Sequence, residues 1–289
     1  MIKLIASDMD GTLLSSHLDI SELNKQAIQE ATDQGIEFMI ATGRAIAEAT
    51  PVLKEAGIKC PLISGNGAQA FDEDGNVLFT VPIDKATIQK IIGVLREHQL
   101  YFEMMTTKGV YSESRPERLE KLATLLAKQV PHITYKMAIA MASTQLELLT
   151  INYVEDYMSL VEDDDIEILK IIAFCEKGQE VLRPIGEEIS QLGQLAITSS
   201  FSNNLEVNHA DAQKGIAVER IAKMRGIDMK DVMAIGDNYN DVSMLAKAGV
   251  SFAMANAEEG VKKVAKYETD FNVNDGVGKA IRRAISEDL

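Results

Sequence analysis

Short apolar runs alternate with amphipathic stretches at the start of the chain. The runs have strand length and the stretches have helix length, in the order 2–7, 21–34, 36–41, 45–56 and 60–64. In the first amphipathic stretch, Ser21 is a candidate N-cap and Gly35 follows the last helical position. This strand and helix order predicts parallel strands joined by right-handed crossovers.

The pattern changes after residue 68. Two short apolar runs flank the turn sequence DEDG at 72–75, which predicts a hairpin. Farther on, helices are predicted over 84–98, 116–129 and 178–191, and strands over 100–105, 109–112, 146–151, 167–174 and 195–200. We interpret this stretch as an inserted α+β unit whose core we expect to contain Met104, Met105, Met137 and Met141.

The first pattern resumes near residue 213. Helices are predicted over 213–225, 240–248 and from 258, with strands over 231–236 and 250–255 and a short strand and helix at the end. The outer segments therefore predict one discontinuous α/β domain with a doubly wound, Rossmann-like parallel sheet, formed by residues 1–82 and 207–289. Residues 83–206 form the insertion, and 289 residues suit two domains of about 150 residues each.

Composition and charge exclude several classes of protein. The net charge of −15 and the absence of a basic patch argue against nucleic-acid binding. The two cysteines, Cys60 and Cys175, show neither disulfide nor zinc spacing. No signal peptide or run of about 18 apolar residues is present, so we expect a cytoplasmic protein with no membrane contact.

Three polar motifs follow predicted parallel strands. DMDGT follows residues 2–7, TGR follows 36–41 and GDNYND follows 231–236. Because ligands of open parallel sheets bind beyond the carboxyl ends of the strands, we expect these motifs to converge on one site.

The convergence would place several carboxylates together. Asp8, Asp10, Asp237 and Asp241 would repel one another unless a cation neutralised them, and an all-oxygen set suits Mg²⁺.

A phosphate site is expected beside this metal. The phosphate-binding groups are a hydroxyl and backbone amides at Thr42, the ammonium of Lys214 and the amide of Asn240. Together with the metal they would neutralise a transferring phosphoryl group.

The spacing of Asp8 and Asp10 suits two catalytic roles. Alternate residues of an extended turn point the same way, so both carboxylates can face one substrate while Met9 points elsewhere. One carboxylate can attack phosphorus, and the other can protonate the leaving oxygen and then activate water.

Four segments of the chain resemble, in order and spacing, the four motifs of the haloacid dehalogenase (HAD) superfamily of phosphohydrolases. They are DMDGTLL, ATGR, Lys214 in AQKGIA and GDNYNDVSML. The long insert and SGNGA at 64–68 resemble the Cof-type branch, whose class IIB α/β cap closes over the active site. This resemblance covers essentially the whole chain.

The resemblance implies a role for each motif residue. Asp8 would be the nucleophile and a Mg²⁺ ligand, and Asp10 the general acid and base, with its backbone carbonyl as a second ligand. The phosphoryl group would be held by Thr42, Gly43, Lys214, Asn240 and the backbone amide of Met9. Asp237 would bind Mg²⁺ directly, with Asn238 and Asp241 near the metal or orienting Lys214.

Two further residues lie in the same loops. Arg44 either binds substrate or pairs with an acid, and Asn66 is a candidate substrate contact because its loop follows a third parallel strand.

The expected function is therefore a Mg²⁺-dependent phosphatase that hydrolyses a small phosphorylated metabolite through an aspartyl-phosphate. Sugar phosphates, flavin mononucleotide and pyridoxal phosphate all suit the family. Two alternatives stay open: a phosphomutase or phosphotransferase on the same scaffold, and a non-catalytic protein that senses phosphorylated metabolites. The sequence does not decide the oligomeric state.

Overall fold

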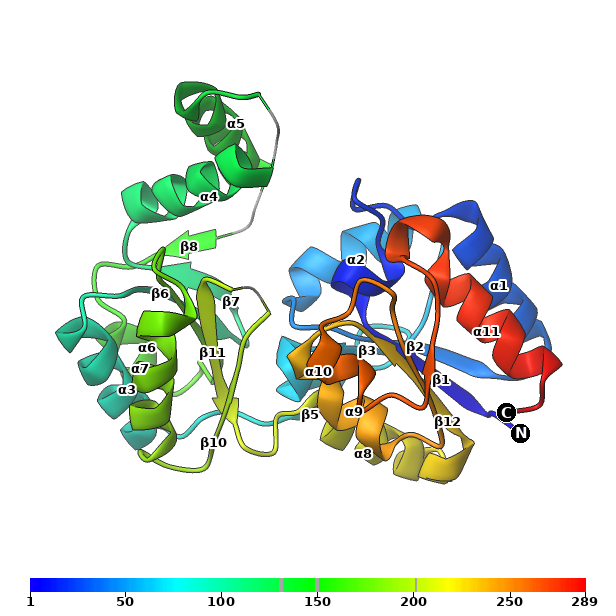
Figure 1. Ribbon diagram of the computed structural model, residues 1–289. Coiled ribbons are helices and arrows are strands. Elements are labelled where there is room, and N and C mark those ends of the chain that lie inside the picture. The colour runs from blue at the N-terminus through cyan, green and yellow to red at the C-terminus, as the bar shows by residue number, and fades with distance from the viewer. Residues whose placement is uncertain (130–131, 149–150, 201) are drawn as a thin grey trace. The chain divides into compact units, whose positions relative to one another are not determined.

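Two compact units make up the chain in the computed structural model, which describes residues 1–129, 132–148, 151–200 and 202–289 (Figure 1). The first unit contains Met1–Pro82, Gln194–Phe201 and Asn208–Leu289, and the second contains Ile83–Gly193 and Ser202–Val207. The short segment Gln194–Phe201, with strand β10 (Leu195–Thr198), groups with the first unit.

The first unit is built on an eight-stranded sheet. Its strands run in the order β14 (Tyr267–Glu268), β13 (Val250–Ala253), β12 (Val232–Gly236), β1 (Leu4–Ser7), β2 (Glu37–Ala41), β3 (Leu62–Ser64), β4 (Gln69–Phe71) and β5 (Val77–Thr80). Pairing is parallel from β14 to β3. The last two strands pair antiparallel and form the predicted hairpin.

Helices cover both faces of this sheet, as the sequence predicted. Figure 1 shows α1 (Glu22–Asp33) and α11 (Gly276–Ser286) on one side and α8 (Lys214–Met224) and α9 (Val242–Lys247) on the other. Further helical segments of the unit include α2 (Ile46–Glu55), α10 (Glu259–Lys262) and the 3₁₀ turns Met229–Asp231 and Asn272–Asn274. The Ser21 side chain accepts a hydrogen bond from the backbone of Asn24, which confirms the predicted N-cap.

The central strands are buried on both faces. Every residue of β1 and β12 is buried, which explains why both strands are continuous apolar runs rather than alternating ones. Ser7 of β1 pairs with Ile40 of β2 and with Ile235 of β12. The residues that follow these three strands therefore lie at one edge of the sheet.

The second unit is an α+β unit. The second, six-stranded sheet runs in the order β10, β11 (Asn204–His209), β9 (Ile168–Phe174), β6 (Tyr101–Thr106), β7 (Gly109–Ser112) and β8 (Ile151–Tyr153). Its helices are α3 (Lys85–Glu97), α4 (Arg115–Gln129), α5 (Tyr135–Leu148), α6 (Met158–Glu162) and α7 (Gln179–Ser190).

The predicted strand over 146–151 is wrong where the structure describes it. Residues 146–148 end α5, residues 149–150 lie outside the described part of the chain, and β8 begins at Ile151. The run of alanine, methionine and leucine that precedes this segment has high helix propensity, and that local preference extends the helix to Leu148.

The expectation for the methionines is half correct. Met104 and Met105 are buried in β6, but Met137 and Met141 are 53% and 44% exposed on α5. The buried part of the contact between the two helices is formed by Ala138 and Ala142 of α5 and an alanine of α4, and partly buried leucines of α4 pack against them. The methionines lie away from that contact.

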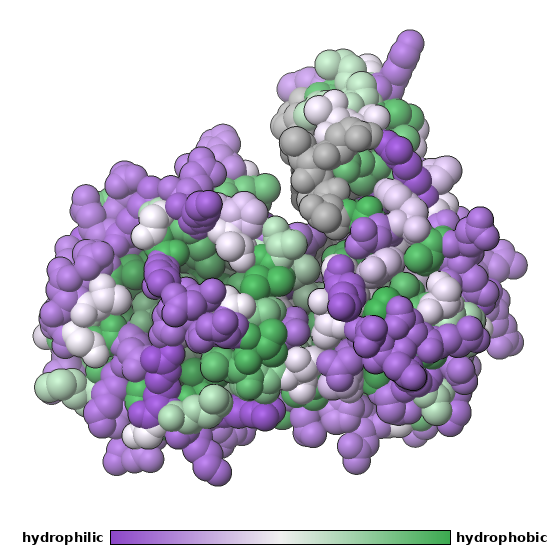
Figure 2. Space-filling model, turned by 180° about the vertical axis from the view of Figure 1, so that it is seen from behind, coloured by the Kyte–Doolittle hydropathy of each residue, from purple (hydrophilic) through white to green (hydrophobic). Residues whose placement is uncertain are grey.

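Hydrophilic residues dominate the face shown in Figure 2, with hydrophobic patches between them. Among the described residues, no helix has both the length and the apolar character needed to cross a membrane.

A substitution at Gly215 tests the packing of α8, and one at Gly93 of α3 serves as the comparison. A Cβ on Gly215 would overlap the backbone of Ser243, so we expect Gly215→Ala to lower the free energy of unfolding by about 1–3 kcal/mol. Gly93 is exposed in α3 with no atom within 4 Å of such a Cβ, so Gly93→Ala should raise that free energy by about 0.5–1 kcal/mol. Urea unfolding measures both changes, and equal effects of the two variants would contradict the described packing.

Candidate active site

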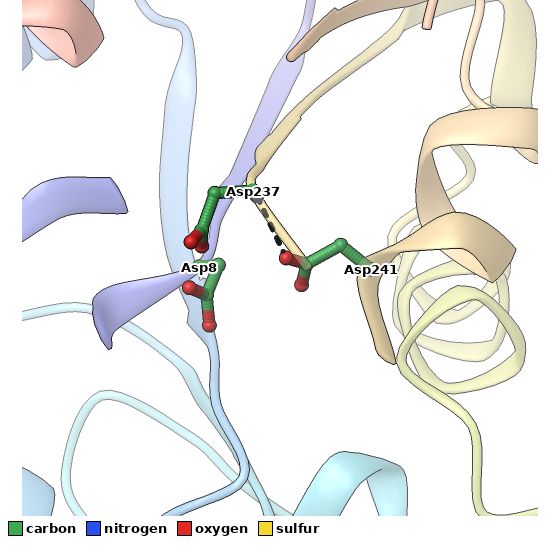
Figure 3. A group of neighbouring side chains, drawn as sticks. All are labelled: Asp8, Asp237 and Asp241. Carbon is green, nitrogen blue, oxygen red and sulfur yellow. Dashed lines mark hydrogen bonds between the residues drawn. The ribbon is translucent and has the colours of Figure 1, made fainter. Parts of the chain in front are cut away.

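Three aspartates meet at the carboxyl edge of the sheet. Asp8 follows β1 and Asp237 follows the neighbouring parallel strand β12, while Asp241 ends the turn Tyr239–Asp241 before α9 (Figure 3). One carboxylate oxygen from each lies within 4.8 Å of the others. The predicted convergence of the first and third motifs is thus present in the structure.

Lys214, the first residue of α8, binds two of these aspartates. Its ammonium is fully buried and lies 2.6 Å from Asp8 Oδ1 and 2.7 Å from Asp241 Oδ1. The other oxygen of Asp241 accepts hydrogen bonds from the backbone N–H groups of Asp237 (2.9 Å) and Asn238 (3.0 Å). Both oxygens of Asp241 are therefore engaged, one by Lys214 and the other by the backbone of the turn.

Burial and crowding change the acidity of the cluster. Burial, then the charge of Asp241, raises the pKa of Asp8 well above its ordinary value despite the nearby Lys214. The same two causes raise the pKa of Asp237 to about 7, against a hydrogen bond from Thr12 that lowers it. Burial alone would lower the pKa of Lys214, but Asp241 and Asp8 outweigh burial and raise it.

The turn Met9–Leu13 carries the first motif past Asp237. Gly11 has a φ of +76°, and a Cβ there would overlap the Asp237 carboxylate, so only glycine fits. Thr12 donates its hydroxyl proton to Asp237 Oδ1 at 2.9 Å. Met9 is fully buried, so its side chain points into the core.

Asp10 lies apart from the three clustered carboxylates. Its side chain is 43% exposed, against 6% for Asp8, and Arg44 holds it in a two-pronged ion pair. Arg44 donates from Nε to Oδ2 at 2.7 Å and from a terminal nitrogen to Oδ1 at 2.5 Å. Of the two sequence interpretations of Arg44, the structure shows pairing with an acid.

The second motif begins directly after β2. Thr42 is buried, its N–H donates to Ile63 at 2.8 Å and its hydroxyl oxygen accepts from the Arg44 N–H at 3.2 Å. Gly43 lies between them in the loop that follows β2. This loop is beside the end of β1, because β2 pairs with β1.

Asn66 and Asn240 meet across two loops. Asn66 is buried in the turn Gly65–Gly67 with a left-handed φ of 63°, and its N–H donates to Thr42 O at 3.0 Å. Asn240 Nδ2 donates to Asn66 Oδ1 at 3.2 Å. Asn238 instead donates its side-chain Nδ2 to the backbone of Ser200 at 2.9 Å.

Two residues of this edge escaped the sequence analysis. Thr12 is the last residue of the DMDGT motif, and its place in that motif could have marked it as a site residue. Asn208 donates to the Gly65 carbonyl at 2.9 Å and accepts from Asn66 at 3.3 Å, and no local pattern in the sequence marks it.

The donor set fits a hard divalent cation. It offers carboxylate oxygens only, and several buried negative charges stand against one ammonium. Asp8 and Asp237 are the best-placed ligands, because Asp241 already binds Lys214 and two backbone amides.

The raised pKa values predict how stability depends on pH. Folding raises the pKa of Asp237 from 3.8 to about 7 and raises that of Asp8, so the folded state binds more protons than the unfolded chain within this window. The free energy of unfolding of metal-free protein should therefore fall as pH rises from 5 to 8. Thermal melting in EDTA between pH 5 and pH 8 measures this decrease in stability.

Asp237→Asn is the control for this pH dependence and should flatten it. Surface carboxylates such as Asp270, whose pKa is lowered to about 2, titrate below the window. A melting temperature that rises from pH 5 to pH 8 in EDTA would contradict the electrostatics described above.

Known proteins resemble the chain over nearly its whole length. The model of the haloacid dehalogenase-like hydrolase family matches residues 5–281. Phosphatase YwpJ of Bacillus subtilis is 31% identical over 286 residues, covering 98% of this chain and 100% of that protein. The 5-amino-6-(5-phospho-D-ribitylamino)uracil phosphatase YcsE of the same organism is 33% identical over 281 residues, covering 97% and 95%.

A solved structure shows the same fold. A haloacid dehalogenase-like hydrolase from B. subtilis aligns with a TM-score of 0.87 and 31% identity, covering 97% of this chain and 99% of that one. The family inferred from the four motifs is confirmed. The chain belongs to the haloacid dehalogenase-like hydrolases of the Cof type and is a phosphatase.

Proposed function

We propose that the protein is a Mg²⁺-dependent phosphatase that hydrolyses a small phosphorylated metabolite through an aspartyl-phosphate on Asp8. The observation that carries the proposal is the buried Asp8 carboxylate, fixed by Lys214 Nζ at 2.6 Å beside Asp237 and Asp241. Such an arrangement places a nucleophilic carboxylate beside a positive charge that can bind the phosphoryl group.

Asp8, Asp237 and the backbone carbonyl of Asp10 would hold Mg²⁺. The ion would supply positive charge that offsets the carboxylates and the phosphate oxygens. The crowding that raises the pKa values of Asp8 and Asp237 supports this assignment, since a cation would relieve it.

Residues of the protein would bind the phosphoryl group around Asp8. Lys214 offers an ammonium that contacts the cluster, with Thr42, Gly43, Asn240 and the Met9 N–H as further donors. Lys214 binds Asp8 Oδ1, so we assign the attack on phosphorus to Oδ2.

The chemistry would proceed in two balanced steps. Asp8 Oδ2 forms a bond to phosphorus while the ester P–O bond breaks, and the leaving oxygen takes a proton from the Asp10 carboxyl group. Asp10 then takes a proton from water, whose oxygen attacks phosphorus and releases phosphate and the Asp8 carboxylate. Asp10 must leave the Arg44 ion pair to do this, so Arg44 holds the acid before reaction.

We assign the choice of substrate to the second unit, Ile83–Gly193 with Ser202–Val207, acting as the inserted cap. The 33% identical relative is named for a phosphorylated ribitylamino-uracil, which supports a small phosphorylated metabolite as substrate. A screen of phosphorylated metabolites as substrates should also include sugar phosphates, flavin mononucleotide and pyridoxal phosphate. Phosphorus NMR of the products separates hydrolysis from phosphoryl transfer to a second alcohol.

Asp8→Asn tests the nucleophile. The amide keeps the shape of the side chain but cannot form the acyl phosphate, so kcat with p-nitrophenyl phosphate should fall at least about 10³-fold. Asp74→Asn is the matched control, because Asp74 pairs with Lys59 on the surface. Parent-like phosphate release by folded Asp8→Asn would refute the aspartyl-phosphate.

Metal removal tests the cation. We expect EDTA to abolish activity and Mg²⁺ to restore it. Mg²⁺ should also raise the melting temperature, and more at pH 8 than at pH 5, because protons compete for Asp237 and Asp8. Asp237→Asn should reduce that thermal shift, and full activity in EDTA would contradict the proposal.

A further inference from the structure

The buried side chain of Asn208 takes no part in the steps above, yet it contacts the loops that surround them. It is 1% exposed, belongs to the first unit and precedes Lys214 by a short turn. Buried amides form hydrogen bonds with defined partners, so the bonds of Asn208 show what it positions.

The Gly65 carbonyl sets the direction of a chain of three amides. A carbonyl can only accept, so Asn208 must present Nδ2 to it, at 2.9 Å. Asn208 Oδ1 then faces Asn66 and accepts from Asn66 Nδ2 at 3.3 Å. Asn66 Oδ1 in turn faces Asn240 and accepts from Asn240 Nδ2 at 3.2 Å.

Asn66 connects this series of amides to the loop that carries Thr42 and to the turn that carries Asn240. The Asn66 N–H binds the Thr42 carbonyl at 3.0 Å, and its side chain binds Asn240. Without Asn208, the Asn66 amide loses an acceptor that holds its NH₂ group away from Asn240. An Asn66 amide rotated by 180° would turn that NH₂ group toward the NH₂ group of Asn240, and the hydrogen bond between the two loops would be lost.

We propose that Asn208 is a positioning residue for phosphoryl binding, which acts by fixing the orientation of Asn66 and, through it, Asn240. The inference rests on the proposed function, because it assigns Asn240 to the phosphate site. Asn208 itself does not touch the substrate in this arrangement.

Asn208→Leu keeps the side-chain size and removes the side-chain hydrogen bonds to Gly65 and Asn66. With p-nitrophenyl phosphate and Mg²⁺, KM and the inhibition constant of inorganic phosphate should each rise about tenfold, the effect of one misplaced hydrogen bond to an anion. Asn208→Ser, a smaller change that carries less risk of misfolding, should shift both constants in the same direction.

Asn24→Leu is the matched control. Asn24 is an equally buried asparagine of the same unit, whose Oδ1 accepts from the Gly278 N–H at 2.8 Å. It should lower the melting temperature and leave KM and the phosphate inhibition constant unchanged. A purely structural Asn208 would behave in the same way, and that result would overturn the proposal.

A double variant shows whether Asn208 acts through Asn66. Asn66→Gly removes that amide and tolerates the left-handed backbone, so adding Asn208→Leu to it should change KM little further. Effects that multiply would overturn the inference.

Failure of the proposed function has a different signature. The wild-type protein would then release no phosphate from any ester. Asn208 would still be tested by the thermal shift that inorganic phosphate produces, which Asn208→Ser should reduce and Asn24→Leu should not.

Discussion

The burial of like charges at one sheet edge is the constraint on which the rest of the site depends. Asp8, Asp237 and Asp241 lie within reach of one another, and one buried ammonium, that of Lys214, binds two of them. Carboxylates without water cost several kcal/mol each unless hydrogen bonds and opposite charge compensate. The Thr12 hydroxyl, two backbone amides and Lys214 supply that compensation in part, and a cation would complete it.

Parallel pairing creates this crowding. Because β1 lies between β12 and β2 with matched register, the loops that follow all three strands begin at one edge. Glycines then let the backbone come close: Gly11 passes against Asp237, and Gly236 leaves no room for a Cβ beside Asp241. Side chains larger than hydrogen at these positions would separate the acids that the site needs together.

Neutral amides connect the loops that follow β3 and β12. Where charge would worsen the repulsion, Asn66, Asn208 and Asn240 connect the loops through directional hydrogen bonds with no net charge. Asp10, in contrast, is partly exposed and forms an ion pair with Arg44. The site thus combines a buried carboxylate bound by Lys214 with a second carboxylate that is partly exposed.

The sequence by itself determined the sheet and the helices of the first unit, because apolar periodicity is a local signal. It also determined Asp8, Asp237 and Lys214 as site candidates, because the order and spacing of the motifs can be recognised along the chain. It failed at 146–148 and at Met137 and Met141, where the pairing of α4 with α5 through alanines decided which residues are buried. Only the tertiary structure showed that Arg44 binds Asp10, that Lys214 binds Asp241, and that Asn208 binds Asn66. These contacts join residues far apart in the chain, and their partners are chosen by hydrogen-bond geometry in three dimensions, which no local pattern encodes.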